Sequence, residues 1–133
     1  MKYLYFCALI LGVISCTEKE KEFQYYYIET YEELSLLGDR TYIENSKPDT
    51  IIEISDSSAY LKAFEKFTLS KKINKDMKET FGHVYKKPLS FQLIDELGND
   101  ITYTTLFDEK DSLENEIEKS IFSKKNSLKE NCE

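Results

Sequence analysis

The chain has little of several residue types on which many active sites depend. Among its 133 residues there is one histidine, His83, and the four glycines are scattered. A single histidine excludes a metal site with two histidine ligands and a Cys/His cluster. Scattered glycines exclude a glycine-rich phosphate-binding loop. The two prolines, Pro48 and Pro88, mark no domain boundary. We therefore expect one folded domain with no metal and no cofactor.

Long apolar runs and basic residues are also scarce. The only extended apolar run, from Tyr3 to Ile14, has 12 residues, whereas a helix needs about 20 to span a bilayer. The chain has 18 basic and 25 acidic residues, a net charge of −7. Nucleic-acid binding needs clustered lysine and arginine, so the acidic balance predicts no nucleic-acid partner. It also disfavours docking of the domain on anionic lipid.

What is present at the start of the chain has the three parts of a secretory signal. A basic start, Met1-Lys2, precedes the apolar run, and a small residue, Ser15, follows it. The next position is a cysteine, and the sequence Val13-Ile14-Ser15-Cys16 resembles the lipobox of bacterial lipoproteins. Leucine is usual where this chain has Val13, and the resemblance covers only residues 1 to about 22. It implies cleavage before Cys16 and attachment of acyl chains such as palmitate to that residue.

The resemblance also implies where the protein is located in the cell and how the chain is divided into segments. We expect residues 1–15 to be a signal peptide, residues 16–22 a lipidated cysteine with a charged tether, and residues 23–133 a single domain. Thr17, rather than aspartate, follows the cysteine, which in the Gram-negative families it resembles favours the outer membrane. We expect the protein at the periplasmic face or the cell surface, held in the membrane by acyl chains on Cys16. Loss of Lys2 leaves 17 basic against 25 acidic residues, a net of −8. One alternative is an ordinary cleaved signal that leaves a free cysteine. Another is an uncleaved anchor, which the short apolar run disfavours.

The remaining cysteines do not predict an internal disulfide. Cys7 leaves with the signal, so Cys132 has no partner in the chain. Because it lies one residue from the end, we interpret it as a free thiol. An intermolecular disulfide is the alternative.

The first half of the domain shows strand patterns followed by a helix pattern. Aromatic and β-branched residues predict a strand, and apolar residues at steps of three and four predict a helix that Gly82 ends. This helix is either one long element or two that meet near Ser70, with Asp56 at its cap. The expected strands are 23–31, 41–44 and 50–55, the last two forming a hairpin, and the apolar positions of the later helix are Leu69, Ile73, Met77 and Phe81.

The second half predicts a hairpin and a closing helix. Residues 90–95 and 101–106 flank turn chemistry at Gly98-Asn99, and Ile101, Tyr103, Thr105 and Phe107 are expected on one face. Asp111 begins a pattern typical of a capping box. The closing helix is expected to bury Leu113, Ile117, Ile121 and Leu128. The order of elements predicts an α+β fold, with a small antiparallel sheet of about five strands and two or three helices packed on one face.

The titratable residues form no pattern typical of an active site. Ser90 or Ser112 could be paired with His83, but no spacing selects either of them. Adjacent acidic pairs could serve acid-base chemistry, yet they fall at expected element ends, where a solvated surface is the simpler interpretation. They are Glu32-Glu33, Asp95-Glu96 and Asp108-Glu109. We predict no catalytic residues and no enzymatic activity.

Three consecutive tyrosines, Tyr25, Tyr26 and Tyr27, are the candidate binding face. Neighbours in a strand point to opposite sides, so Tyr26 must face away from the other two. Tyrosine is favoured at interfaces because it combines apolar area with a polar tip. Ordinary cross-strand packing is the alternative interpretation.

Three functions remain open. The first is a lipid-anchored, non-catalytic binding or accessory module that engages an envelope protein or a glycan. The second is a small acidic inhibitor or immunity-type lipoprotein that neutralises a basic toxin or lytic enzyme, since its net charge would attract such a target. The third is a minor envelope hydrolase.

Overall fold

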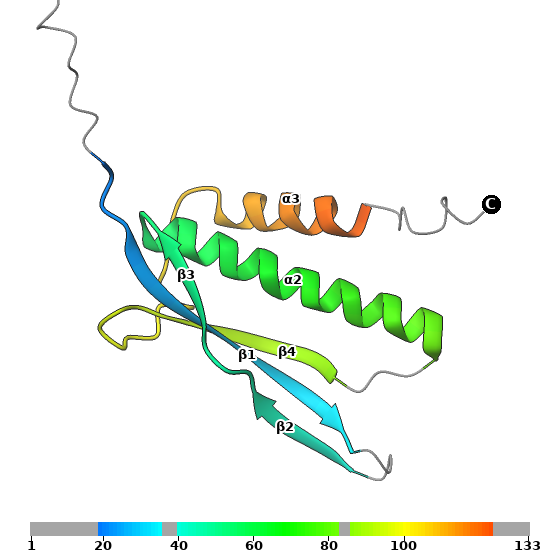
Figure 1. Cartoon of the computed structure of the whole chain (residues 1–133). Helices are drawn as coiled ribbons and strands as arrows, with labels where there is room; N and C mark the ends of the chain where they lie inside the picture. The colour runs from blue at the N-terminus through cyan, green and yellow to red at the C-terminus, as the bar shows by residue number, and fades with distance from the viewer. Residues whose placement is uncertain (1–18, 36–39, 83–85, 124–133) are drawn as a thin grey trace, which may run out of the picture.

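The computed structural model describes residues 19–35, 40–82 and 86–123. Four strands form one antiparallel sheet, and two helices lie on one side of it (Figure 1). The predicted α+β class is confirmed, with four strands instead of about five. The elements in chain order are β1 (Phe23–Leu34), β2 (Thr41–Asn45), β3 (Asp49–Glu53), α2 (Asp56–Phe81), β4 (Lys86–Ile94) and α3 (Lys110–Ser123).

The long strand β1 lies at the centre of the sheet. On one side it pairs with β4, and on the other it pairs with both β2 and β3. The predicted hairpin between residues 41–44 and 50–55 is therefore wrong. β1 is long enough, at 12 residues, to pair with both short strands in succession. Ser46 holds the break between them against β1, because its N–H donates to the Glu29 carbonyl at 2.8 Å and its hydroxyl accepts from the Glu29 N–H at 2.9 Å.

The second predicted hairpin is also wrong, because β4 has no partner strand at residues 101–106. After β4 a single bridge joins Ile94 to Asp100. The chain then folds into a turn in which the Thr105 hydroxyl donates to the Ile101 carbonyl at 2.8 Å. Ile101 and Thr105 are buried there, whereas Tyr103 is exposed. Local side-chain hydrogen bonds thus replace the ladder that alternation predicts.

α2 is a single helix, which decides between the two interpretations left open by the sequence. Its N-cap is Ser55 rather than Asp56, because the Ser55 hydroxyl accepts from the N–H of Ser58 at 3.2 Å. Gly82 ends the helix as predicted. Its backbone has φ +75°, a left-handed conformation that favours glycine.

α3 runs beside α2. It begins at Lys110, so Asp111 lies in its first turn and not at the predicted cap position. Leu113, Ile117 and Ile121 are half-buried on one side of it, while Leu128 lies outside the described residues. The two helices are joined by a hydrogen bond of 2.7 Å from the Tyr60 hydroxyl to Glu114.

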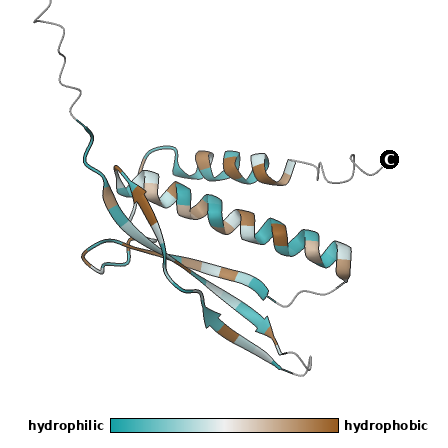
Figure 2. Ribbon diagram, in the orientation of Figure 1, coloured by the Kyte–Doolittle hydropathy of each residue, from teal (hydrophilic) through white to brown (hydrophobic). Residues whose placement is uncertain are grey.

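An aromatic core fills the space between the sheet and α2. The Phe91 ring lies among three others, with centroid distances of 5.8 Å to Tyr27, 5.8 Å to Tyr60 and 5.4 Å to Phe67. Ala59 and Ala63 of α2 are fully buried, and their small side chains allow the helix close to the sheet. Figure 2 shows hydrophobic and hydrophilic bands alternating along both helices. The sheet contributes Tyr25, Tyr27, Ile51, Phe91 and Leu93 to this core.

The second half of α2 extends beyond the core. No residue of α2 after Thr68 is buried, and the four apolar residues expected to continue its buried side remain exposed: Leu69, Ile73, Met77 and Phe81. Within the described residues, neither helix has the length and apolar character needed to cross a membrane.

Candidate functional site

The three consecutive tyrosines divide between the two faces of the sheet. Tyr25 is 2 % exposed and Tyr27 is 5 % exposed, and both point into the core under α2. Tyr26 lies between them on the opposite face and is half-buried. The structure therefore leaves Tyr26 as the one residue of the candidate binding face that a partner could reach.

The hydroxyls of the two core tyrosines have structural partners. That of Tyr25 donates to Asp56 at 2.8 Å, and that of Tyr27 donates to Glu29 at 2.7 Å. Burial, followed by these hydrogen bonds to carboxylates, raises the pKa of both hydroxyls above the ordinary value for tyrosine. Ser70 of α2 also donates to Glu29, at 2.9 Å. The bonds to Asp56 and from Ser70 connect the sheet to the helix, and both tyrosine hydroxyls already have partners within the protein.

The side of the sheet that the helices leave uncovered carries no charged side chain across β3, β1 and β4. Tyr26 lies at its centre, between Thr50 of β3 and Ile94 of β4. The Gln24 amide donates to the Tyr26 hydroxyl at 2.8 Å. We call this surface the outer face, and none of its residues is buried: Gln24, Tyr26, Ile28, Thr30, Thr50, Ile52, Ser90, Gln92 and Ile94.

Charged side chains lie at the margins of the outer face. The pairing register between β1 and β4 shifts after Thr30. Beyond this point the Lys86 ammonium lies 3.7 Å from Glu33 and 4.5 Å from the centre of the Tyr31 ring. At the other margin, the Gln92 amide donates to Asp100 at 3.3 Å. The outer face is thus an uncharged surface with charged groups at its margins.

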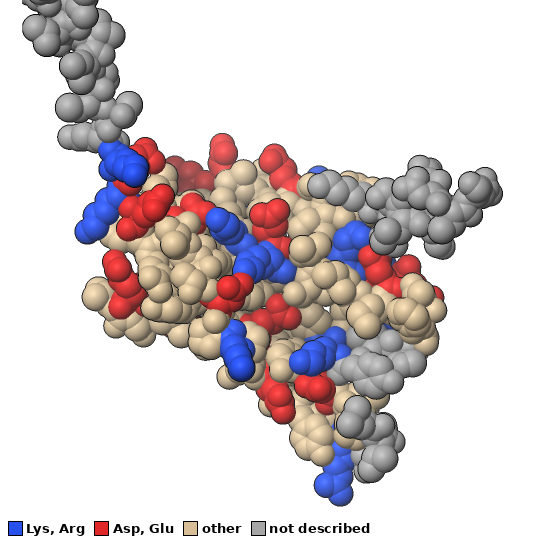
Figure 3. Space-filling model, viewed as in Figure 1, with Lys and Arg blue, Asp and Glu red and all other residues tan. Residues whose placement is uncertain are grey.

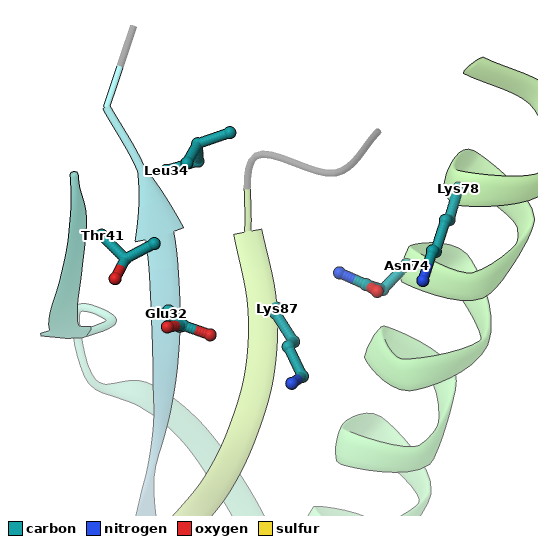
Figure 4. A pocket seen from close by; sticks show the side chains of 6 residues that line it. All are labelled: Glu32, Leu34, Thr41, Asn74, Lys78 and Lys87. Atoms are coloured by element: carbon teal, nitrogen blue, oxygen red, sulfur yellow. The ribbon is translucent and has the colours of Figure 1, made fainter. Parts of the chain in front are cut away.

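A hollow of about 310 Å³ opens between the far end of the sheet and the second half of α2. Figure 4 shows Asn74 extending from the helix towards Lys87 of β4, with the Lys78 side chain running along the helix beside Asn74. Among the described residues that line the hollow, Glu32 is the only one with a carboxylate, whereas acid-base chemistry on a sugar requires a pair. The other residues that line it are Leu34, Thr41 and Lys87.

A second hollow, of about 230 Å³, lies beside the first residues of β1 and contains Asp56, Asp95 and Glu96. Two of these carboxylates hold the fold together. Asp56 accepts from Tyr25, and Asp95 accepts from the side chain and backbone of Asn99. The Asn99 side-chain bond is the main cause that lowers the pKa of Asp95 below its ordinary value. Among the described residues, no group of acidic, histidine or cysteine side chains could hold a metal ion.

Several residues singled out in the sequence lie outside the described part of the chain, namely Cys16, His83 and Cys132. Of the acidic pairs, Glu32 lines the first hollow and Glu33 pairs with Lys86. Charges of both signs are interspersed on the side of the molecule shown in Figure 3. The Lys62 ammonium lies 2.9 Å from the Glu53 carboxylate, and Lys66 forms an ion pair with Asp49.

The sequence contains the signal that could have identified the outer face. Alternate positions of three strands are uncharged, at residues 24, 26, 28 and 30, at 50 and 52, and at 90, 92 and 94. Period-two alternation places each set on one side of its strand. The prediction named Tyr25, Tyr26 and Tyr27 because tyrosine is favoured at interfaces, whereas the threonines, glutamines and isoleucines are informative only as a set.

Comparison with known proteins does not place this chain in a family: no family model, no curated protein and no solved structure matches it.

Proposed function

We propose that this protein is a lipid-anchored, non-catalytic binding or accessory module of the bacterial cell envelope, which engages a protein or a glycan through the outer face. The observation that carries the proposal is an uncovered sheet face without charged side chains in a chain that is 32 % charged. The anchor in this proposal is a set of acyl chains on Cys16, and the location is the outer membrane.

The chemistry of the outer face favours binding. A charged group must lose its hydration when a partner covers it, at a high cost unless it is paired. Lysine, glutamate and aspartate are accordingly depleted at the centres of protein interfaces, and tyrosine is enriched. The outer face has the same bias, with Tyr26 at its centre and isoleucine, threonine and glutamine around it.

Tyr26 is held in place before any partner arrives. It lies between Thr50 and Ile94 in neighbouring strands, and the hydrogen bond from Gln24 occupies its hydroxyl. A side chain already fixed in its bound conformation loses less entropy on binding. We therefore propose Tyr26 as the residue that contributes most to affinity.

The outer face separates this proposal from the role of an acidic inhibitor. Attraction of a basic target through net charge weakens as salt screens it, whereas contact through an uncharged face depends little on salt. Capture of the partner should therefore persist when the ionic strength is raised. Capture that is lost at high salt would favour the inhibitor.

The anchor is tested by replacing Cys16 with alanine in the full chain. We expect the variant to incorporate no labelled fatty acid and to leave the membrane fraction. The unchanged protein should incorporate the fatty acid and stay in the membrane fraction. Replacement of Cys132 by alanine is the matched control and should change nothing. A Cys16→Ala protein that still takes up fatty acid and stays with the membrane would contradict lipidation.

The binding face is tested by placing a photoreactive amino acid at Tyr26 or at Thr50 in living cells. We expect cross-linked products of the same mass from both positions. The matched control is Tyr42 of β2, a tyrosine that is 50 % exposed outside the outer face, and it should give none of them. Equal products from Tyr42, or none from Tyr26, would refute the outer face as the binding site.

A further inference from the structure

Three apolar side chains project into solvent from the segment between β4 and α3. Leu97, Leu106 and Tyr103 are 83 %, 82 % and 78 % exposed, more than any other large hydrophobic residue in the described part of the chain. The three lie within ten residues of one another in the sequence, and large apolar groups exposed on one segment indicate a surface that meets an apolar partner. We call these three residues the apolar tip.

Hydrogen bonds hold the apolar tip in this exposed arrangement. The N–H groups of Leu97 and Asn99 both donate to Asp95, at 2.9 Å and 2.8 Å, which fixes the turn that carries Leu97. On either side of Tyr103, the Thr102 and Thr105 side chains are buried and hydrogen-bonded within the segment. The exposed side chains therefore belong to an ordered scaffold.

The apolar tip lies at the end of the domain where the tether enters. Leu97 lines the same hollow as Phe23, the first residue of β1. Phe107, next to Leu106, packs its ring 6.1 Å from that of Tyr60 in the first turns of α2. In Figure 1 the segment after β4 and the first residues of β1 lie at the same end of the molecule.

The length of the tether places this end next to the membrane, provided that Cys16 is lipidated as proposed above. Six residues lie between Cys16 and Phe23, and an extended chain over these positions spans at most about 25 Å. β1 then runs for 12 residues away from the tether, which carries the opposite end of the sheet about 40 Å further.

We propose that the apolar tip inserts Leu97, Tyr103 and Leu106 into the surface of the membrane that holds the acyl chains. The domain then stands on the end at which β1 begins, and the outer face is held upright, accessible from the side. The tip restricts the orientation of the domain, which a tether alone would leave free.

The charges beside the tip define the lipid that it contacts. Glu96 precedes Leu97, and Asp108 and Glu109 follow Leu106 at short distances in the sequence. These carboxylates are repelled by anionic headgroups. The tip is therefore suited to a zwitterionic surface.

The orientation is tested with the full lipidated protein in phosphatidylcholine vesicles. A fluorescent label is attached through Leu97→Cys or Leu106→Cys, with Cys132→Ser to leave one thiol. We expect quenching by a lipid-attached quencher and protection from an aqueous one. The matched control is Ile43→Cys, an isoleucine on β2 that is 72 % exposed, and it should show the reverse. Equal quenching of all three labels in a protein that remains anchored would overturn the proposal.

A second label position and the mass of the protein separate the possible failures. Quenching of a label at Ile52→Cys by the lipid-attached quencher would show that the domain lies on its outer face, which also overturns the proposal. Absence of acyl chains from Cys16, found by intact-mass analysis, would instead contradict the proposed anchor. A separate experiment measures how much the tip contributes to membrane binding in a protein that has no acyl anchor.

For that measurement, the mature chain from residue 16 with Cys16→Ser is mixed with zwitterionic vesicles. Replacing both Leu97 and Leu106 by serine should lower its partitioning at least about tenfold, since two leucine side chains lose their burial. Replacing Tyr42 and Ile43 by serine should leave partitioning unchanged, and vesicles with anionic lipid should bind the unchanged tip less. If the variant with serine at both Leu97 and Leu106 partitions into the vesicles as the unchanged chain does, insertion of the tip is refuted.

Discussion

The two faces of one strand, β1, differ in what covers them and hence in what the same residue type does. Tyr25 and Tyr27 face α2, are buried, and donate to carboxylates that connect the sheet to the helix. Tyr26, between them, faces away from both helices and belongs to an uncharged, uncovered surface. Residue type therefore does not identify a binding tyrosine in this sheet. The side on which the helix packs does.

The largest effect is expected when a tyrosine of the buried face and the tyrosine of the outer face are each replaced by alanine. Tyr27→Ala removes a ring packed against Phe91 and should lower the free energy of unfolding by about 3–5 kcal/mol. Tyr26→Ala should lower it by less than about 1.5 kcal/mol, because its ring is not enclosed in the core. Chemical denaturation followed by circular dichroism measures both. Equal losses would contradict the division between the faces.

High pH should destabilise the protein through the inner-face tyrosines. Burial and carboxylate partners raise the pKa of Tyr25 and Tyr27 in the folded protein, whereas the unfolded value is about 10. The stabilisation is complete below about pH 10 and is lost as the pH rises above it, by up to about 1.4 kcal/mol per pH unit for each group. Thermal melts between neutral and strongly alkaline pH measure this. In Tyr27→Phe, stability should fall less steeply with rising pH. An unchanged dependence on pH would refute the role of the Tyr27 hydroxyl.

A smaller effect is expected at Thr68 of α2. Its side chain is fully buried, and its hydroxyl has no hydrogen-bond partner among residues 19–35, 40–82 and 86–123. Valine has nearly the same shape without the hydroxyl, so Thr68→Val should raise the free energy of unfolding by about 1 kcal/mol. Denaturation of this variant beside Thr102→Val provides the contrast, because the Thr102 hydroxyl accepts from the Leu93 N–H at 2.7 Å. Thr102→Val should destabilise, and a gain in both variants would contradict this account.

The smallest effect on stability is expected on the outer face. Ile52→Lys introduces a charge at a position that is 55 % exposed, and should change the free energy of unfolding by no more than about 0.5 kcal/mol. It should nevertheless abolish the cross-links that form from Tyr26, because a lysine would have to lose its hydration in the complex. Ile43→Lys is the matched control and should preserve them. Retained cross-links in Ile52→Lys would count against the outer face.

Local signals predicted the elements more reliably than their partners. The strand pattern of Tyr25 to Tyr27, the helix periodicity and the end of α2 at Gly82 all depend on neighbouring residues, and the structure has each of them. Both predicted hairpins failed because Pro48 and Gly98 indicate turns without indicating which strands pair across them. The strands before and after Pro48 both pair with β1 instead of with each other, because β1 is long enough to pair with them in succession.

The candidate site was predictable in the same limited sense. Alternation alone placed Tyr26 opposite Tyr25 and Tyr27, but it could not show which side faces the helices. The uncharged outer face requires three strands to be aligned, and β3 and β4 become neighbours of β1 from more than 20 residues away in the chain. Such pairing depends on contacts between distant segments, which a period of two does not encode.

The sequence by itself determined where most of the strands and both helices lie, the acidic balance, and the resemblance to a lipobox on which the proposed anchor depends. These follow from residues close together in the chain, through backbone preference, side-chain spacing and charge. Only the tertiary structure decided that α2 covers Tyr25 and Tyr27, that Tyr26 stays accessible, and that Leu97 lies beside the start of β1. Burial depends on which distant surfaces exclude water together, and that choice is made by the whole domain.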